Sequence, residues 1–408
     1  MGDILFLAHR VPFPPNRGDK IRAHHLLRKL ATIAPVHVGC FAETAEDRAG
    51  AAELARIAAS NCVINRSKPM VLAGVEAVLA GKPVSLTAFH SARIESWVRA
   101  TIANRRIETI VIFSGQMGQY VPDDFAGRVV IDLCDVDSAK FESYAEAGER
   151  VWINAREARL LAREEERLGH RADATILITE AEAELFRSRL HDPSRTHVKI
   201  IGNGIDAAFF DPSCAEPHRD FVASPGPHFV FTGQMDYRPN EQAALWVIDE
   251  VLPRIRKTLP QAQFHVVGRN PTARLMAQSR LPGVNITGEV ADVRPYLVGA
   301  SCVLAPLRIA RGVQNKVLEA MAMRCAVLLT PEAATGIAAA DAKHWAVCHA
   351  DPDAFAQAAI ALAGGGSGMA AIGNAAREFV LQHHAWEAIL APLDTVMNGE
   401  QREARDAA

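Results

Sequence analysis

Cysteine is scarce in this sequence, and no two cysteines stand close together. The 408 residues include seven cysteines, and none of them shows the Cys-x-x-Cys spacing of a zinc site or a thiol redox motif. Most of them lie in apolar, strand-like runs, which is typical of buried free thiols. We therefore expect reduced cysteines and a cytoplasmic protein.

Long apolar segments and an excess of positive charge are also missing. The opening MGDILFLAHR contains only a short apolar run, and no later run approaches the roughly 18 apolar residues of a membrane span. The formal net charge of −3 argues against nucleic acid as the main partner. Any membrane contact is therefore expected at the protein surface.

The sequence instead contains two successive series of alternating strands and helices. In the first half, runs such as DILFLAH and RVVIDLC alternate with helical patterns, the first over residues 18–33. A second series begins at HFVFTG, after a Pro-, Ser- and Asp-rich segment. This order predicts two Rossmann-like α/β domains that face each other across a cleft. We place them at residues 1–210 and 211–384, followed by a helix and frayed tail at 385–408 that pack back toward the first domain.

One short motif is typical of dinucleotide-binding proteins, but it is not followed by the helix that such a motif opens. Residues 202–207 match the G-x-G-x-x-A fingerprint of dinucleotide-binding domains. A true fingerprint opens a helix, whereas this one runs into Phe209, Phe210 and Pro212. A dehydrogenase is therefore not the preferred interpretation.

The stretch RIARGVQNKVLEAMAMRCAVLLTPEAATG gathers positive charges ahead of an apolar helix. We expect the helix over residues 313–323 and a buried strand over 326–330. A helix N-terminus favours an anion, and Arg311 and Lys316 would add two positive charges there. Gly312 and Val313 would offer backbone N–H groups. The stretch therefore predicts a phosphate-binding site.

Several of these runs together resemble a known family. The segment over residues 229–336 resembles the donor domain of GT-B glycosyltransferases of family 4, through VFTGQMDYRPN, FHVVGRNP and NKVLEAMAMRCAVLLT. The first half is most similar to sugar transferases of the PEP-CTERM/exosortase systems, through HRVPFPPNRGDKIRAHHLLRKLA and DLCDVDSAKFESYAE. The resemblance implies a GT-B fold and retaining transfer from a nucleotide-sugar donor to a glycan or lipid-linked glycan. It also implies a role in exopolysaccharide biosynthesis.

The resemblance also assigns donor-site residues. Glu319 matches the family glutamate that hydrogen-bonds the ribose hydroxyls, and Lys316 and Arg238 would reach the diphosphate. Many relatives carry a sugar-binding glutamate where this chain has Arg311, which suggests a diphosphate clamp or an acidic donor sugar. The base would lie against Gly268, Arg269, Gly288 and Val290. A solvated glutamate and lysine and ordinary turn glycines are the alternatives.

The first domain would bind the acceptor. Arg17 and Gly18 open the first helix and form a candidate anion site, with a simple Pro/Gly turn as the alternative. Asp135 and Asp137 follow a strand at the cleft edge, where relatives carry a histidine that is missing here. Asp137 would orient a sugar hydroxyl or merely cap a helix. Our catalytic candidates are Asp137, Asp135 and Lys316; no metal and no other cofactor is expected.

Two charged helices complete the expectations. The basic residues of the first helix can contact anionic lipid headgroups, or form a plain amphipathic surface; they are Arg17, Lys20, Arg22, Arg28 and Lys29, with His24 and His25. The helix AREARLLAREEERLGH is expected to be a solvated face with ion pairs one turn apart. Two other functions stay open beside the transferase: a nucleotide-sugar epimerase, and an inactive subunit that only binds nucleotide sugar.

Overall fold

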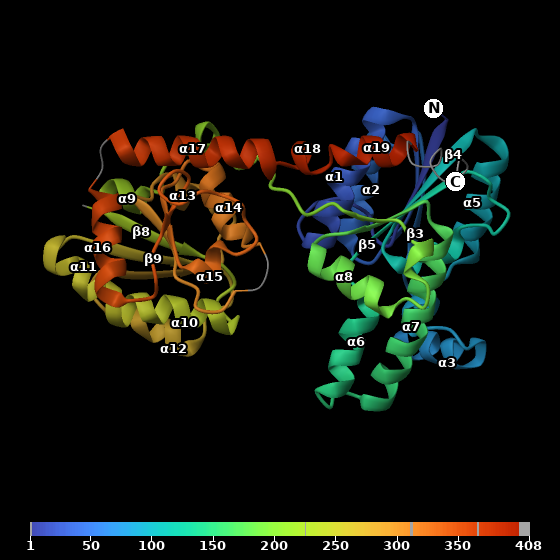
Figure 1. Cartoon of the computed structure of the whole chain (residues 1–408), viewed down its shortest axis with the longest axis horizontal. Helices are drawn as coiled ribbons and strands as arrows, with labels where there is room; N and C mark the ends of the chain where they lie inside the picture. The colour runs from blue at the N-terminus through green and yellow to red at the C-terminus, as the bar shows by residue number, and fades with distance from the viewer. Residues whose placement is uncertain (1, 225, 311–312, 365–366, 400–408) are drawn as a thin grey trace. The chain divides into compact units, whose positions relative to one another are not determined.

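The computed structural model describes residues 2–224, 226–310, 313–364 and 367–399 (Figure 1). The chain divides into two compact units. Unit 1 comprises residues 1–203 and 389–408, and unit 2 comprises residues 204–388. The domain limits expected from the sequence, at residues 210 and 384, stay predictions.

Unit 1 is built on a parallel sheet of seven strands in the order β3-β2-β1-β4-β5-β6-β7. The strands are β1 (Asp3–Ala8), β2 (Val36–Ala42), β3 (Ser60–Asn65), β4 (Ile107–Phe113), β5 (Arg128–Cys134), β6 (Ala174–Leu177) and β7 (Val198–Ile200). The helices are α1 (Gly18–Ile33), α2 (Ala45–Ile57), α3 (Met70–Ala80), α4 (Val84–Ala88), α5 (Ala92–Asn104), α6 (Asp137–Glu146), α7 (Val151–Arg171), α8 (Glu180–Arg189) and α19 (Pro392–Asn398).

Unit 2 has a parallel sheet of six strands in the order β10-β9-β8-β11-β12-β13. The strands are β8 (His228–Thr232), β9 (Gln263–Val267), β10 (Val284–Gly288), β11 (Cys302–Ala305), β12 (Val327–Leu329) and β13 (Ala346–Val347). The helices are α9 (Arg219–Ala223), α10 (Arg238–Trp246), α11 (Leu252–Thr258), α12 (Ala273–Met276), α13 (Arg294–Val298), α14 (Asn315–Ala322), α15 (Pro331–Ala334), α16 (Pro352–Ala363), α17 (Ser367–His383) and α18 (Trp386–Ile389).

The central strands explain why the sequence pattern was readable. Residues 4–8 of β1 and 109–113 of β4 are buried without interruption, because helices cover both faces of a parallel sheet. Such strands read as continuous apolar runs rather than as alternating ones. The expectation of two Rossmann-like α/β domains is confirmed.

Two expected helices have different limits. The helix expected over residues 313–323 begins only at Asn315 and ends at Ala322. The closing helix is two short helices, α18 and α19, and the second begins at Pro392. Proline has no backbone N–H, so it fits the first turn of a new helix better than the interior of a long one.

The basic surface expected on α1 is wrong for three of its seven residues, because Lys20, Arg22 and His24 are buried, whereas Arg17 and Arg28 are exposed. Lys20 Nζ lies 2.7 Å from Asp47 Oδ1 on α2. Arg22 Nε lies 2.8 Å from Asp132 Oδ2 on β5, and its Nη atoms donate to the carbonyls of Ile201 and Gly202. These charges face partners inside the protein, where they cannot meet lipid headgroups.

The solvated face expected on α7 is also wrong at two glutamates. Glu157 accepts hydrogen bonds from the backbone N–H groups of Val84 and Ser85, both at 2.8 Å. Glu165 accepts from the N–H of Ser138 at 2.9 Å and from its hydroxyl at 2.5 Å. The two buried carboxylates thus satisfy N–H groups in the first turns of α4 and α6 that have no partner within the helix.

The described helices include none with the length and apolar character needed to cross a membrane. This finding agrees with the absence of a long apolar run in the sequence.

We predict that Arg22→Met lowers the free energy of unfolding of unit 1 by about 3 to 5 kcal/mol, because it leaves Asp132 buried and unpaired. The measurement is urea unfolding followed by circular dichroism. The control is Arg106→Met, which removes an exposed pair with Glu108 at 2.7 Å and should cost about 0 to 1 kcal/mol. Equal unfolding midpoints for both variants would contradict the prediction.

Candidate functional site

A cavity of about 520 Å³ opens in unit 1 beside the carboxyl ends of β1, β4 and β5. These strands are neighbours at the point where the strand order changes direction, a common ligand site in such sheets. The cavity brings together four residues proposed from the sequence, Arg17, Gly18, Asp135 and Asp137. Segments more than 100 residues apart in the chain therefore meet at this cavity.

His9 is one of several cavity residues that the sequence interpretation did not propose for the site. It directly follows β1, is only 9% exposed, and its ring stacks on Phe113 with centroids 5.6 Å apart. Its Nε2 lies 2.9 Å from Arg10 Nη1 and 3.2 Å from Asp19 Oδ2. A ring nitrogen carries either a lone pair or a proton, so Nε2 accepts from the arginine or donates to the carboxylate. The signal for this residue was a polar side chain at a strand's carboxyl end.

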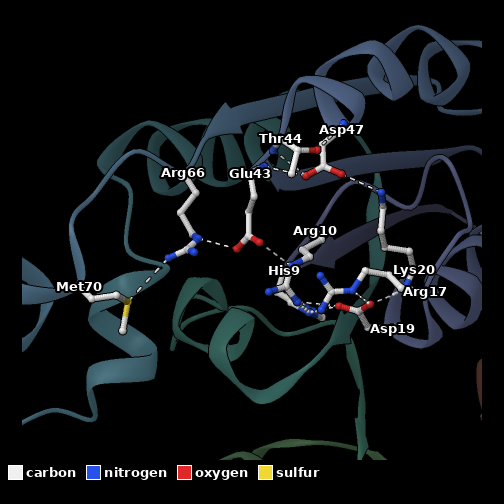
Figure 2. A network of polar contacts seen from close by, with 10 residues as sticks. All are labelled: His9, Arg10, Arg17, Asp19, Lys20, Glu43, Thr44, Asp47, Arg66 and Met70. Carbon is white, nitrogen blue, oxygen red and sulfur yellow. Dashed lines mark hydrogen bonds and ion pairs between the residues drawn. The ribbon is translucent and has the colours of Figure 1, made fainter. Parts of the chain in front are cut away.

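The surroundings of His9 form a connected polar network (Figure 2). Arg10 Nη1 lies 2.6 Å from Asp19 Oδ2, and Arg17 Nε lies 2.8 Å from Asp19 Oδ1. Burial alone would raise the pKa of the Asp19 carboxyl, but the hydrogen bonds from His9 and Arg10 and the charge of the Arg10 guanidinium outweigh it and hold that pKa far below its usual range. Asp19 therefore stays a carboxylate and holds the two arginines beside the cavity.

Asp137 is the first residue of α6 and is partly buried in the cavity wall. Burial, followed by the nearby charge of Asp135, raises the pKa of its carboxyl. Gln116 Nε2 donates to Asp137 Oδ2 at 3.4 Å, and Lys140 Nζ lies 4.0 Å from Oδ1. The residue before the helix is Val136, whose side chain makes no cap hydrogen bond, and the first-turn N–H of Ser138 is bound by Glu165 rather than by Asp137. The capping alternative is therefore not the observed geometry, and Asp137 can accept a hydrogen bond from a ligand.

Gly18 and Asp135 present open surface in the same cavity. A Cβ added at Gly18 would meet no atom within 4 Å, so protein packing does not explain the glycine. Asp135 is exposed. Both positions leave room for a ligand to approach the helix start and the strand end.

In unit 2, Lys316 and Glu319 lie one turn apart on α14. Lys316 Nζ donates to Asn240 Oδ1 and lies 4.9 Å from the centre of the Phe231 ring. Burial lowers the pKa of Lys316 to about 8. Burial also raises the pKa of Glu319 to about 7, against a smaller opposite effect of Lys316. Both side chains are thus only weakly hydrated, as a ligand-binding pair would be.

Three glycines at strand ends stand beside this pair. Gly233 follows β8, Gly268 follows β9, and Gly288 ends β10; all three have positive φ. A Cβ built on Gly268 would lie 1.6 Å from the carbonyl oxygen of Gly233, and one on Gly233 would lie 3.1 Å from Lys316 Nζ. The backbones of Gly233 and Gly268 therefore approach each other at a distance that no side chain on Gly268 permits, and Gly233 lies close to Lys316. Gly233 was not among the residues proposed from the sequence.

The remaining donor-site candidates lie mostly on the surface. The side chains of Arg238 and Arg269 are exposed, and Arg269 Nη2 donates to Gln234 Oε1 at 2.7 Å. Val290 packs against the core of unit 2, and Val313 is 38% exposed. Arg311 and Gly312 lie outside the described residues, so their assignment stays a prediction. Roles for the other site residues are likewise predictions that geometry alone does not test.

A metal site does not emerge from the geometry of the described ranges. In that part of the chain, no three His, Cys, Asp or Glu side chains group as metal ligands. The expectation that the reaction needs no metal stays a proposal.

The fold agrees with comparisons to known proteins. Residues 226–364 match the family model described as glycosyl transferases group 1. The chain is similar to sucrose-phosphate synthase of Thermosynechococcus elongatus, with 17% identity, full coverage of both chains and a TM-score of 0.59. No curated protein sequence matches the chain.

Two further solved structures have the same fold. Anabaena HepE in complex with UDP and glucose shows 14% identity over 98% of this chain and 100% of its own, with a TM-score of 0.61. WaaG, a glycosyltransferase involved in lipopolysaccharide biosynthesis, shows 16% identity over 96% and 99%, with a TM-score of 0.58. The chain thus has the GT-B fold, and its residues 226–364 match the group 1 glycosyl transferase model.

Proposed function

We propose that this protein transfers a sugar from a nucleotide-sugar donor to a glycan or lipid-linked glycan, with retention of the anomeric configuration. The observation that carries the proposal is the partly buried pair Lys316 and Glu319 on α14 of the matched segment, with Lys316 Nζ next to the strand-end glycine Gly233. Retention, membership of glycosyltransferase family 4 and a role in exopolysaccharide biosynthesis rest on the sequence resemblance. We place the reaction in the cytoplasm, because nucleotide sugars are made there.

The donor would bind in unit 2 through few charged groups. Glu319, as a carboxylate, would accept hydrogen bonds from two ribose hydroxyls, and Lys316 would contact the diphosphate. The bond between the anomeric carbon and the diphosphate breaks in the reaction, so negative charge grows on the leaving group. Lys316, Arg311 and backbone N–H groups would stabilise that charge, which makes a metal unnecessary. HepE was solved with UDP and with UDP-glucose, and UDP is therefore the first ligand to test.

The acceptor would bind in the cavity of unit 1. Asp137 and His9 present one carboxylate and one imidazole there, and either can hold an acceptor hydroxyl by a hydrogen bond. An epimerase would need no such acceptor, and an inactive binding subunit would not consume the donor. Release of nucleoside diphosphate that depends on acceptor excludes both alternatives.

We predict that Lys316→Met, Glu319→Gln and Arg311→Ala each weaken UDP binding about tenfold to a hundredfold, because each removes a hydrogen bond to a charged group. Titration calorimetry measures the dissociation constants. The matched control is Lys257→Met, an exposed lysine of α11, which should bind UDP like the parent. If all three variants keep the parental affinity, the donor site is assigned wrongly.

We also predict that UDP affinity is greatest between about pH 7 and pH 8. Below the Glu319 pKa of about 7, the carboxyl is protonated and loses acceptor capacity for the ribose; above the Lys316 pKa of about 8, the ammonium loses its charge. Calorimetry across this range provides the test. In Glu319→Gln the loss of affinity on the acidic side should disappear, and its persistence there would contradict the assignment.

A further prediction concerns the cavity in unit 1. Asp137→Asn and His9→Gln should lower turnover about tenfold or more and leave UDP affinity unchanged, because both residues act on the acceptor or the reacting sugar. Initial rates of UDP release measure turnover. Asp124→Asn, at an exposed position of the same unit, is the control. Parental rates in both variants would show that the cavity takes no part in the reaction.

A further inference from the structure

Helix α3 exposes an almost entirely apolar surface. Of its eleven residues, MVLAGVEAVLA, only Ala73 and Ala77 are buried. At about 100° per residue, the exposed apolar side chains cover about 200° of the helix circumference. They are Met70 (57% exposed), Val71 (80%), Leu72 (49%), Val75 (52%), Val78 (59%) and Leu79 (83%). The helix is thus a convex apolar ridge attached to the protein by two alanines.

The start of α7 continues this apolar surface. Val151, Trp152 and Ile153 are 53%, 72% and 49% exposed. Arg156 Nη2 donates to the carbonyl of Ala77 at 2.8 Å, which places α7 against α3, as Figure 1 also shows. Ile153 lies one turn before Arg156 and therefore on the same side of α7. Trp152 lies four residues before Arg156 and hence also on this side, and we call the surface formed by α3, Trp152 and Ile153 the apolar ridge.

The length of α3 limits what it can be. An apolar run of about 10 to 14 residues is typical of a buried core helix or of a segment at a membrane interface, and is too short to span a bilayer. The exposure of α3 excludes a core helix. A convex ridge does not fit the shape of a peptide-binding groove, whereas it can enter the boundary between lipid headgroups and acyl chains.

Charge around the ridge favours an anionic surface. Four exposed cations lie on or beside these helices, Lys82, Arg150, Arg159 and Arg163, against two exposed carboxylates at the end of the α6–α7 hairpin, Glu146 and Glu149. Glu76, the one charged residue of α3, is paired with Lys68 at 2.7 Å. Lys82 lies in the short loop between α3 and α4. Ala77 before this loop and Val84 after it both contact α7. Cations beside a membrane-facing surface attract anionic headgroups.

We propose that the apolar ridge docks on the anionic leaflet of a lipid bilayer, with its apolar side chains at the headgroup and acyl-chain boundary and Trp152 at the same depth. The ridge belongs to the unit that holds the acceptor cavity. Figure 2 shows contacts from Met70, at the start of α3, through Arg66 and Glu43 to Arg10 of that cavity. Docking would bring a lipid-linked acceptor to this unit. This role of the docking rests on the proposed function.

The test is co-sedimentation of the full chain with vesicles of phosphatidylcholine, about one third of it replaced by phosphatidylglycerol, without donor or acceptor. We expect the parent to bind, and the double variant Val71→Gln/Leu79→Gln to partition about tenfold or more less strongly. Val222→Gln is the matched control, because Val222 is an equally exposed valine (76%) of unit 2, and it should bind like the parent. Brominated lipids should quench Trp152 fluorescence, which a Trp152→Phe variant identifies by difference.

Three results would overturn the docking. They are absence of parental binding to these vesicles, equal binding of the double variant, and a parental dimer that fails to bind vesicles and that the double variant converts to a monomer. The last result would show that a second copy covers the ridge. Calorimetry with UDP on the same samples separates the two proposals. Vesicle binding without UDP binding leaves the docking intact and removes the donor site, and the reverse result removes only the docking.

Discussion

The buried ion pair between Arg22 and Asp132 supports the cavity of unit 1. Arg22 is 2% exposed and Asp132 is not exposed at all, and the same guanidinium also donates to two carbonyls of residues 201–202. One side chain therefore joins α1, β5 and the segment that follows β7. Since either charge alone would be costly to bury, these three segments cannot separate without a large loss of stability. The start of α1 and the residues after β5, which form opposite parts of the cavity wall, are held by the same contact.

Unit 2 places charge under a different constraint. Lys316 and Glu319 are both poorly hydrated, so the pKa of the lysine falls and that of the glutamate rises. The close approach of Gly233 and Gly268 leaves space for the lysine where any side chain would intrude. Such a site favours a ligand that brings negative charge to the lysine and hydroxyl donors to the glutamate. A nucleoside diphosphate, the ligand class proposed above, has both.

Unit 1 also reverses the usual relation between side-chain chemistry and exposure in two of its helices. The basic residues Lys20 and Arg22 of α1 are buried against carboxylates, whereas the valines and leucines of α3 face outward. Each arrangement has a chemical consequence. The buried charges order the cavity, and the exposed apolar side chains favour contact with a lipid surface over contact with water.

The amino-acid sequence alone determined the fold class, because strand and helix periodicity is local and both sheets consist of continuous apolar runs joined by helices. It also placed Lys316 and Glu319 on one helix face, since a spacing of three residues sets that relation by itself. Only the tertiary structure revealed His9 beside Asp19 and in the cavity of Asp137. The reason is that the strand order places the carboxyl ends of β1 and β5 on either side of β4. The tertiary structure also determined that Arg22 and Glu165 are buried and that the apolar side chains of α3 are exposed. Burial depends on partners such as Asp132 and Ser138 that lie far along the chain, and no local pattern records them.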